Sequence, residues 1–113
     1  MEQLFEKIKE YLHMETEIPF NEFSDYHKQV TQALNKGFED MNQEMRLKAR
    51  YVCSIVQANA DSRAKRSKKN AKGYKKISAK SGFWMDAINY RLIKDGMTQA
   101  EIDSKTEEIN EAI

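Results

Sequence analysis

The fold is decided by the stretch from Phe23 to Ala60, which reads FSDYHKQVTQALNKGFEDMNQEMRLKARYVCSIVQANA. Its apolar residues follow one another at steps of three and four, so they share one face of a helix. Only Asn35-Lys36-Gly37 offers a break, because glycine lowers helix propensity and tolerates a left-handed turn. The apolar stripe consists of Phe23, Tyr26, Val30, Ala33, Leu34, Phe38, Met41, Met45, Ala49, Val52, Ile55 and Val56, and it continues to Asn59.

Two arrangements of this stretch follow from the possible break. An unbroken helix of about 40 residues is a rod of ~60 Å, whereas a compact domain of this length has a radius of gyration of only about 13 Å. Such a rod needs a partner helix, most simply from a second copy, and therefore predicts a homodimer. If Gly37 breaks the rod, Ser24–Lys36 and Phe38–Ala60 fold back as an antiparallel pair within a monomeric bundle. The sequence leaves both arrangements open.

Helices are also predicted on both sides of the stripe. A first helix is expected from Glu2 to Glu15, where large apolar residues fall at helical spacing. Pro19 ends or separates it, because the residues before a proline are held extended. Asn21 or Ser24 can cap the helix that follows.

The last third of the chain predicts a helical hairpin. Ser81 or Gly82 begins its first helix, and Asp95-Gly96 stops that helix with Gly96 as a C-terminal cap. Thr98-Gln99-Ala100-Glu101 has the form of a capping box and opens the final helix. The expected fold is all-α: one domain, a helical bundle around one long amphipathic helix, with a C-terminal helical hairpin. Its parts are helical residues 1–60, a basic exposed helix or arm at 61–80, and the hairpin at 81–113.

The segment from Arg63 to Lys80, RAKRSKKNAKGYKKISAK, holds nine basic residues in eighteen positions and no acid. The formal charge of the whole chain is only +1, so the other 95 residues carry a net charge of −8. Such asymmetry is typical of a surface that meets a polyanion. Large apolar residues are missing between Ala60 and Tyr74, so we expect an exposed helix extension, a loop or a disordered arm, with Gly73 ending any helix.

This basic segment predicts binding to nucleic acid, DNA or RNA, with little base specificity. Lysines and arginines would neutralise phosphates, and Tyr74 would stack on an unpaired base. The predicted contact residues are Arg63, Lys65, Arg66, Lys68, Lys69, Lys72, Tyr74, Lys75, Lys76 and Lys80. An acidic protein surface and plain solvation are the other interpretations of the same charges.

The rival function is a protein-binding adaptor or inhibitor. In that interpretation the stripe from Phe23 to Val56, or the exposed face of Phe83-Trp84, docks on another protein while the lysines hold its acidic surface. Salt dependence separates the two functions, because phosphate binding weakens steeply with salt and a protein partner depends on apolar anchors such as Trp84.

No enzyme, cofactor or metal site is predicted. His13 and His27 lie 14 residues apart, and only single Glu–His pairs near His13 approach a ligand spacing. The isolated glycines form no phosphate-binding loop. Cys53 is the only cysteine and lies in an apolar helical pattern, so we interpret it as a small core residue.

The sequence predicts neither a membrane span nor a secretory signal. No run approaches the roughly 18 apolar residues that a span needs, and the acidic, amphipathic N-terminus lacks the pattern of a signal peptide. A single unpaired cysteine fits a reducing compartment, so a cytoplasmic location is expected.

The order of elements after Tyr74 is similar to that of the ribbon-helix-helix repressors. In that resemblance Tyr74–Lys80 is a short basic strand, followed by a helix, the Asp95-Gly96 turn and a second helix. The stretch Gly96–Ile102 is equally similar to the second helix of helix-turn-helix repressors. Lysines crowd both faces of the would-be strand, and a capped helical hairpin that packs on the long helix explains the same residues.

Overall fold

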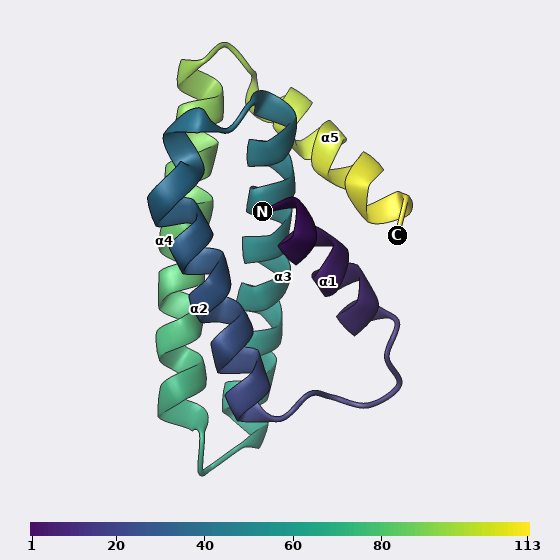
Figure 1. Ribbon diagram of the computed structural model, residues 1–113, viewed down its shortest axis with the longest axis vertical. Helices are drawn as coiled ribbons and strands as arrows, with labels where there is room; N and C mark the ends of the chain where they lie inside the picture. Colours follow the sequence, from purple (N-terminus) through teal and green to yellow (C-terminus); the bar gives the residue numbers. More distant parts are fainter.

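The computed structural model describes residues 1–113 and contains five α-helices, one short 3-10 helix and no strands (Figure 1). The all-α prediction is therefore confirmed. The α-helices are α1 (Glu2–Leu12), α2 (Phe20–Gly37), α3 (Gln43–Arg66), α4 (Ala71–Lys94) and α5 (Gln99–Glu111), and the 3-10 helix η1 spans Phe38–Asp40. No helix combines the length and the apolar character needed to cross a bilayer.

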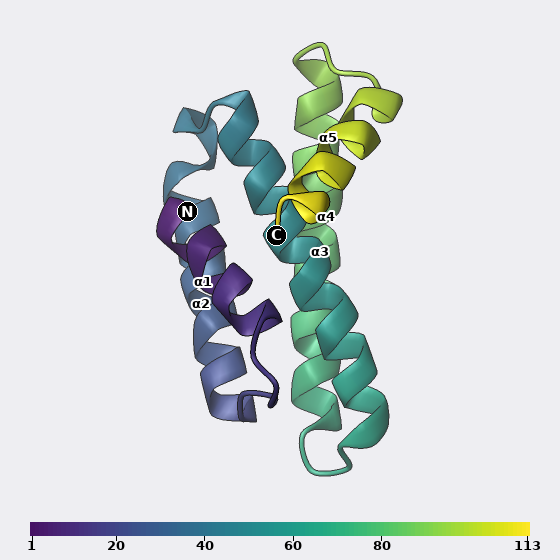
Figure 2. The same ribbon diagram turned by 90° about the vertical axis from the view of Figure 1, so that its right-hand side faces the viewer.

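The helices pack in two layers. One layer is the antiparallel hairpin of α3 and α4, and the other consists of α1 and α2. Figure 2 shows α1 and α2 together on one side of this hairpin, and α5 lying across α3 near the C-terminal end of α4. The molecule measures 43 × 25 × 23 Å, with a radius of gyration of 13.9 Å. These dimensions are those of a compact helical bundle, not of a rod.

The long stripe is broken after Gly37, where the chain reverses through η1. Asn42 caps α3 by accepting a hydrogen bond from the backbone N–H of Met45 at 2.8 Å. The buried guanidinium of Arg46 fastens the reversal, since its Nη2 donates to the carbonyl of Phe38 at 2.9 Å and its Nη1 to Asp95 of the α4 end at 2.9 Å. The unbroken rod is therefore excluded. The homodimer stays a prediction, but the unbroken rod from which it was inferred does not form.

Once the chain has reversed, the stripe is buried inside a single chain. Twenty buried hydrophobic residues form one core cluster, which includes Val30 and Leu34 of α2 and Val52 and Val56 of α3. Cys53 is only 2% exposed, which confirms it as a core residue. Burial raises the pKa of its thiol to about 12, so the thiol stays protonated at neutral pH.

Two predicted signals at the C-terminal turn are confirmed. Gly96 has a φ of +113°, a backbone conformation that residues with a Cβ rarely adopt. The Thr98 hydroxyl accepts from the N–H of Glu101 at 3.1 Å, and the Glu101 carboxylate accepts from the N–H of Thr98 at 3.0 Å. The pKa of Glu101 is lowered, because the backbone and the side chain of Thr98 both stabilise the ionised carboxylate.

Several predicted boundaries near the N-terminus are wrong. The first helix ends at Leu12 and not at Glu15. The second begins at Phe20 with Pro19 in the N-cap position, so neither Asn21 nor Ser24 caps it. Proline needs no backbone donor there, and its fixed φ suits the entry into a helix.

The largest correction concerns the start of α4, which begins at Ala71 and not at Ser81 or Gly82. Gly73 lies inside α4 and does not end a helix. A Cβ on Gly73 would stand 2.6 Å from the ring of Phe20, so glycine at this position permits close approach of α2. Tyr74–Lys80 is likewise helical, which removes the strand of the ribbon-helix-helix resemblance.

We expect Gly96→Ala to lower the free energy of unfolding by about 1–2 kcal/mol, because alanine is strained at positive φ. Gly37→Ala is the matched control: Gly37 has a φ of −124°, and no atom lies within 4 Å of the place that an alanine Cβ would take, so its change should be neutral or slightly stabilising. Urea unfolding followed by circular dichroism measures both. Equal effects of the two substitutions would contradict the assigned role of Gly96.

Candidate nucleic-acid interface

The basic segment forms the closed end of the α3–α4 hairpin. It comprises the last turn of α3, the connection at 67–70 and the first ten residues of α4, at the lower tip in Figure 1. The Ser67 hydroxyl accepts a hydrogen bond from the N–H of Asn70 at 3.1 Å and closes the turn. The segment is therefore an ordered part of the bundle and not a disordered arm.

Helical spacing sorts the residues of early α4 onto two faces. Tyr74, Ile77 and Ser81 are buried against α2 and α3, whereas Lys72 and Lys76 are exposed on the opposite face. Ser78 is buried on the same side, and its hydroxyl donates a hydrogen bond to the Asp61 carboxylate of α3. The segment was predicted to lie outside the core because it contains few large apolar side chains.

Seven lysines of the basic segment are exposed and form no ion pair within the protein. Elsewhere six of the ten cations pair with a carboxylate, among them Lys48 with Glu2 at 3.0 Å. The uncompensated positive charge therefore gathers at the hairpin tip and along the outer side of α4. We call this set the lysine face; its members are Lys65, Lys68, Lys69, Lys72, Lys75, Lys76 and Lys80.

Three predicted contact residues are engaged within the protein. Arg63 is only 8% exposed, and its Nη1 donates to the carbonyl of Ile18 at 2.9 Å. Arg66 is exposed but donates to Glu17 at 2.6 Å, and this bond holds the pKa of the Glu17 carboxyl below its usual range. Tyr74 is the clearest correction.

The ring of Tyr74 is 5% exposed and meets the rings of Phe20 and Phe23 edge to face, at centroid distances of 5.0 and 5.5 Å. Stacking of Tyr74 on a base therefore does not fit its place in the core. Both aromatic partners come from α2, about fifty residues earlier in the chain. No local pattern around Tyr74 reveals them.

Two other aromatic rings lie on the exposed face of α4. Phe83 and Tyr90 are each 67% exposed, and they continue the face of Lys72, Lys76 and Lys80 at helical spacing. The steps of three, four and seven residues from these lysines were visible in the sequence and would have indicated both rings. They are the side chains that can stack on an unpaired base.

A shallow hollow of about 360 Å³ joins the lysines to the first of these rings. It lies between α2 and α4 and is lined by Thr31, Ala79, Lys80, Phe83 and Trp84. Trp84 is half-buried, with its ring 6.0 Å from that of Phe38. Of the predicted Phe83-Trp84 pair, only Phe83 is therefore exposed.

His27 lies behind the lysine face, buried on the inner side of α2. Its backbone carbonyl accepts a hydrogen bond from the Thr31 hydroxyl at 3.0 Å. Burial, together with the positive charge of Lys80, lowers the pKa of the His27 imidazole. No group of three or more metal-ligating side chains lies together anywhere in the protein.

Comparison with known proteins does not assign the chain to a family: no family model matches it, and no curated protein or solved structure shows significant similarity to it.

We expect the protein to lose stability as the pH falls from 7.5 to 5.5, in part through His27. Its pKa in the folded state lies below the unfolded value of 6.5, so the unfolded state binds the proton more readily at acid pH. One such group changes the unfolding free energy by at most about 1.4 kcal/mol per pH unit. Urea unfolding at both pH values should show a smaller loss for His27→Gln, whereas His13→Gln, at an exposed position, should behave like the unchanged protein.

Proposed function

We propose that this protein is a small accessory protein that binds nucleic acid through the lysine face, largely independently of base sequence. The observation that carries the proposal is the contrast in pairing: seven exposed lysines without a carboxylate partner lie together, while most other cations are paired. Lysines presented in this way displace the counterions condensed on the phosphates of a nucleic acid, and this release supplies most of the non-specific affinity.

A single strand of nucleic acid can lie along the exposed face of α4. From Lys72 to Tyr90 this face is about 27 Å long, at 1.5 Å per residue. Its first half carries lysines, and its second half carries Phe83 and Tyr90 about 10 Å apart along the helix axis. A strand laid along α4 would place phosphates on the lysines and unpaired bases on the rings.

The acidic side chain of Asp86 supports this division of the face. Asp86 is exposed and lies between Phe83 and Tyr90 at helical spacing. A carboxylate repels phosphates, so the backbone of a bound strand is favoured at the lysine half and the bases at the ring half. A duplex cannot offer its bases to the rings, so single strands should bind more tightly.

The protein-binding adaptor stays the second candidate, on one specific observation. Phe83, Tyr90 and Ile93 are large apolar side chains that stay exposed on one side of α4, with Ile93 at 45%. A protein with an acidic rim around an apolar pocket would cover them. In that case the rings would be anchors and the lysines would form the rim.

Changing Lys68, Lys69, Lys75 and Lys76 together to Ala should weaken duplex DNA binding at least a hundredfold at 50 mM salt. The slope of log affinity against log salt should become shallower by about 3 to 4, because about 0.9 counterion is released per phosphate contact. Fluorescence anisotropy across a salt series measures both, and circular dichroism checks that helicity is kept.

The matched control removes the same charge elsewhere, with Lys7, Lys9, Lys36 and Lys105 changed to Ala. This variant should keep the salt slope of the unchanged protein. If both variants lose affinity equally, net charge and not the lysine face is responsible, and the proposal is wrong.

Phe83→Ala and Tyr90→Ala should each weaken single-stranded DNA or RNA binding by about 5- to 100-fold, since stacking contributes about 1–3 kcal/mol per base. Duplex binding should change less than twofold. Ile93→Ala is the control on the same helix, because it removes an exposed apolar side chain without a ring. An Ile93 effect as large as that of the two rings would favour the protein-binding adaptor instead.

A further inference from the structure

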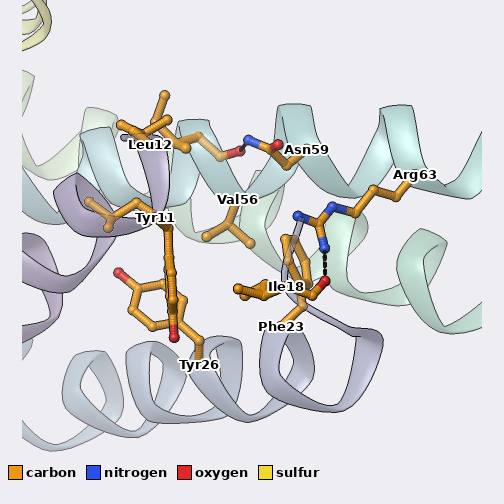
Figure 3. A pocket seen from close by; sticks show the side chains of 10 residues that line it. Tyr11, Leu12, Ile18, Phe23, Tyr26, Val56, Asn59 and Arg63 are labelled. Carbon is orange, nitrogen blue, oxygen red and sulfur yellow. Dashed lines mark hydrogen bonds between the residues drawn. The ribbon is translucent and has the colours of Figure 1, made fainter. Parts of the chain in front are cut away.

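A small pocket lies between α1, α2 and α3, away from the connection at 67–70. Its volume is about 60 Å³, and eight of its ten lining residues are hydrophobic. Figure 3 shows the guanidinium of Arg63 at one end of the pocket, beside Phe23 and Ile18, and the rings of Tyr11 and Tyr26 at the other. The pocket is therefore an apolar space with one cation at its wall.

Only one of the three guanidinium nitrogens of Arg63 forms a hydrogen bond within the protein. Nη1 donates to the carbonyl of Ile18 at 2.9 Å, as the dashed line in Figure 3 shows. Nε is the only buried side-chain nitrogen or oxygen in the protein that lacks a hydrogen-bond partner. In an arginine whose Nη1 is engaged, Nε and Nη2 form the free edge of the planar fork, and such an edge binds a carboxylate through two parallel hydrogen bonds.

No carboxylate of the protein forms an ion pair with this guanidinium, although Glu15 and Glu17 line the second hollow beside it. The carboxylate of Glu17 bonds to Arg66 at 2.6 Å; this bond lowers the pKa of Glu17, and the charge of Arg63 contributes less. The face of Phe23, 4.5 Å away, offers partial compensation. A buried cation without an anion is unfavourable, so an unpaired donor here calls for an explanation.

The other polar side chains of the pocket each form a hydrogen bond within the protein. The Tyr11 hydroxyl donates to Glu22 at 2.9 Å, and burial together with this carboxylate raises the pKa of Tyr11 to about 12. The Tyr26 hydroxyl donates to the carbonyl of Leu4 at 2.6 Å. The amide nitrogen of Asn59 donates to the carbonyl of Ile55 at 2.9 Å. Arg63 is the one charged residue in the lining, so its free edge would select an anionic ligand.

A second hollow opens beside Arg63. It has a volume of about 220 Å³, lies beneath the connection between α1 and α2, and shares Tyr11, Leu12, Ile18, Asn59 and Arg63 with the pocket. Leu12 at the mouth is 41% exposed. A small molecule can thus come beside Arg63 from the second hollow, and the side chains that cover Nε move aside for it to bind there.

We propose that this pocket binds a small monocarboxylate with a short apolar chain. The carboxylate lies on the Nε–Nη2 edge of Arg63, and the chain lies among Ile8, Ile55 and Val56. The pocket holds only a few water-sized groups, which suits a chain of about three or four carbons. A phosphate fits poorly, because its additional oxygens would find no donors in an apolar lining.

The test is a titration with sodium 3-methylbutanoate, followed by NMR of methyl groups and of the arginine Nε–H. We expect saturable shifts at Ile8, Ile18 and Ile55 and at the Arg63 Nε–H, with a dissociation constant in the millimolar range. The neutral analogue 3-methylbutan-1-ol should bind at least tenfold more weakly. Equal binding of acid and alcohol, shifts confined to the lysine face, or no saturation would each overturn the proposal.

Two variants separate a binding site from a structural arginine. Arg63→Met keeps an apolar stem over Phe23 and should weaken carboxylate binding at least tenfold, whereas the matched Arg66→Met should leave it unchanged. Should Arg63→Met fail to fold, Ile55→Phe fills the pocket and keeps the guanidinium, and it should abolish binding while the fold is retained. Unchanged binding in Ile55→Phe would place the ligand elsewhere and overturn the proposal. The outcome is independent of nucleic-acid binding, which none of these measurements uses.

Discussion

The close packing of α3 against α4 is the constraint on which the rest of the structure depends. The two helices make the most extensive contact in the protein, and small residues such as Ala49, Cys53, Ala60 and Ser81 are fully or almost fully buried there. A Cβ on Gly82 would stand 2.6 Å from Gln57 of α3, so even the backbone of α4 comes near. Because the hairpin is held along its length, its connection at 67–70 is a fixed end, and the lysines beside it are displayed on rigid helices.

The chemistry of the two kinds of cation explains how the basic segment divides. Arginine has a planar fork that stacks on rings and tolerates burial, whereas the ammonium of lysine is strongly hydrated. Arg63 accordingly lies on Phe23 in the interior, and Arg66 binds Glu17 at its edge. Both fasten the connection between α1 and α2. Every lysine of the segment stays in water, where salt screens the repulsion between neighbours.

Sequence patterns revealed those features whose causes lie close together along the chain. The stripe from Phe23, the positive φ of Gly96 and the capping box at Thr98 all arise within one or two helical turns. The start of α4 and the burial of Tyr74 were missed, because their cause is contact with Phe20 and Phe23 of α2. For the same reason the sequence allowed two arrangements at Gly37. The choice between them depends on Arg46, whose bonds reach Asp95 across the fold.

At the candidate interface, too, the sequence alone does not show which side chains are exposed. The sequence located the positive charge correctly along the chain, but charge alone does not tell which side chains face water. Arg63 lies inside because it bonds to Ile18 and stacks on Phe23, and Tyr74 lies inside because α4 is helical from Ala71. The same helical periodicity turns Phe83 and Tyr90 outward. One structural fact, the early start of α4, therefore removes one aromatic ring from the surface and places the lysines on the same helix face as two others. An aromatic ring among lysines indicates stacking on a base only once the helix that carries it has been placed against its neighbours.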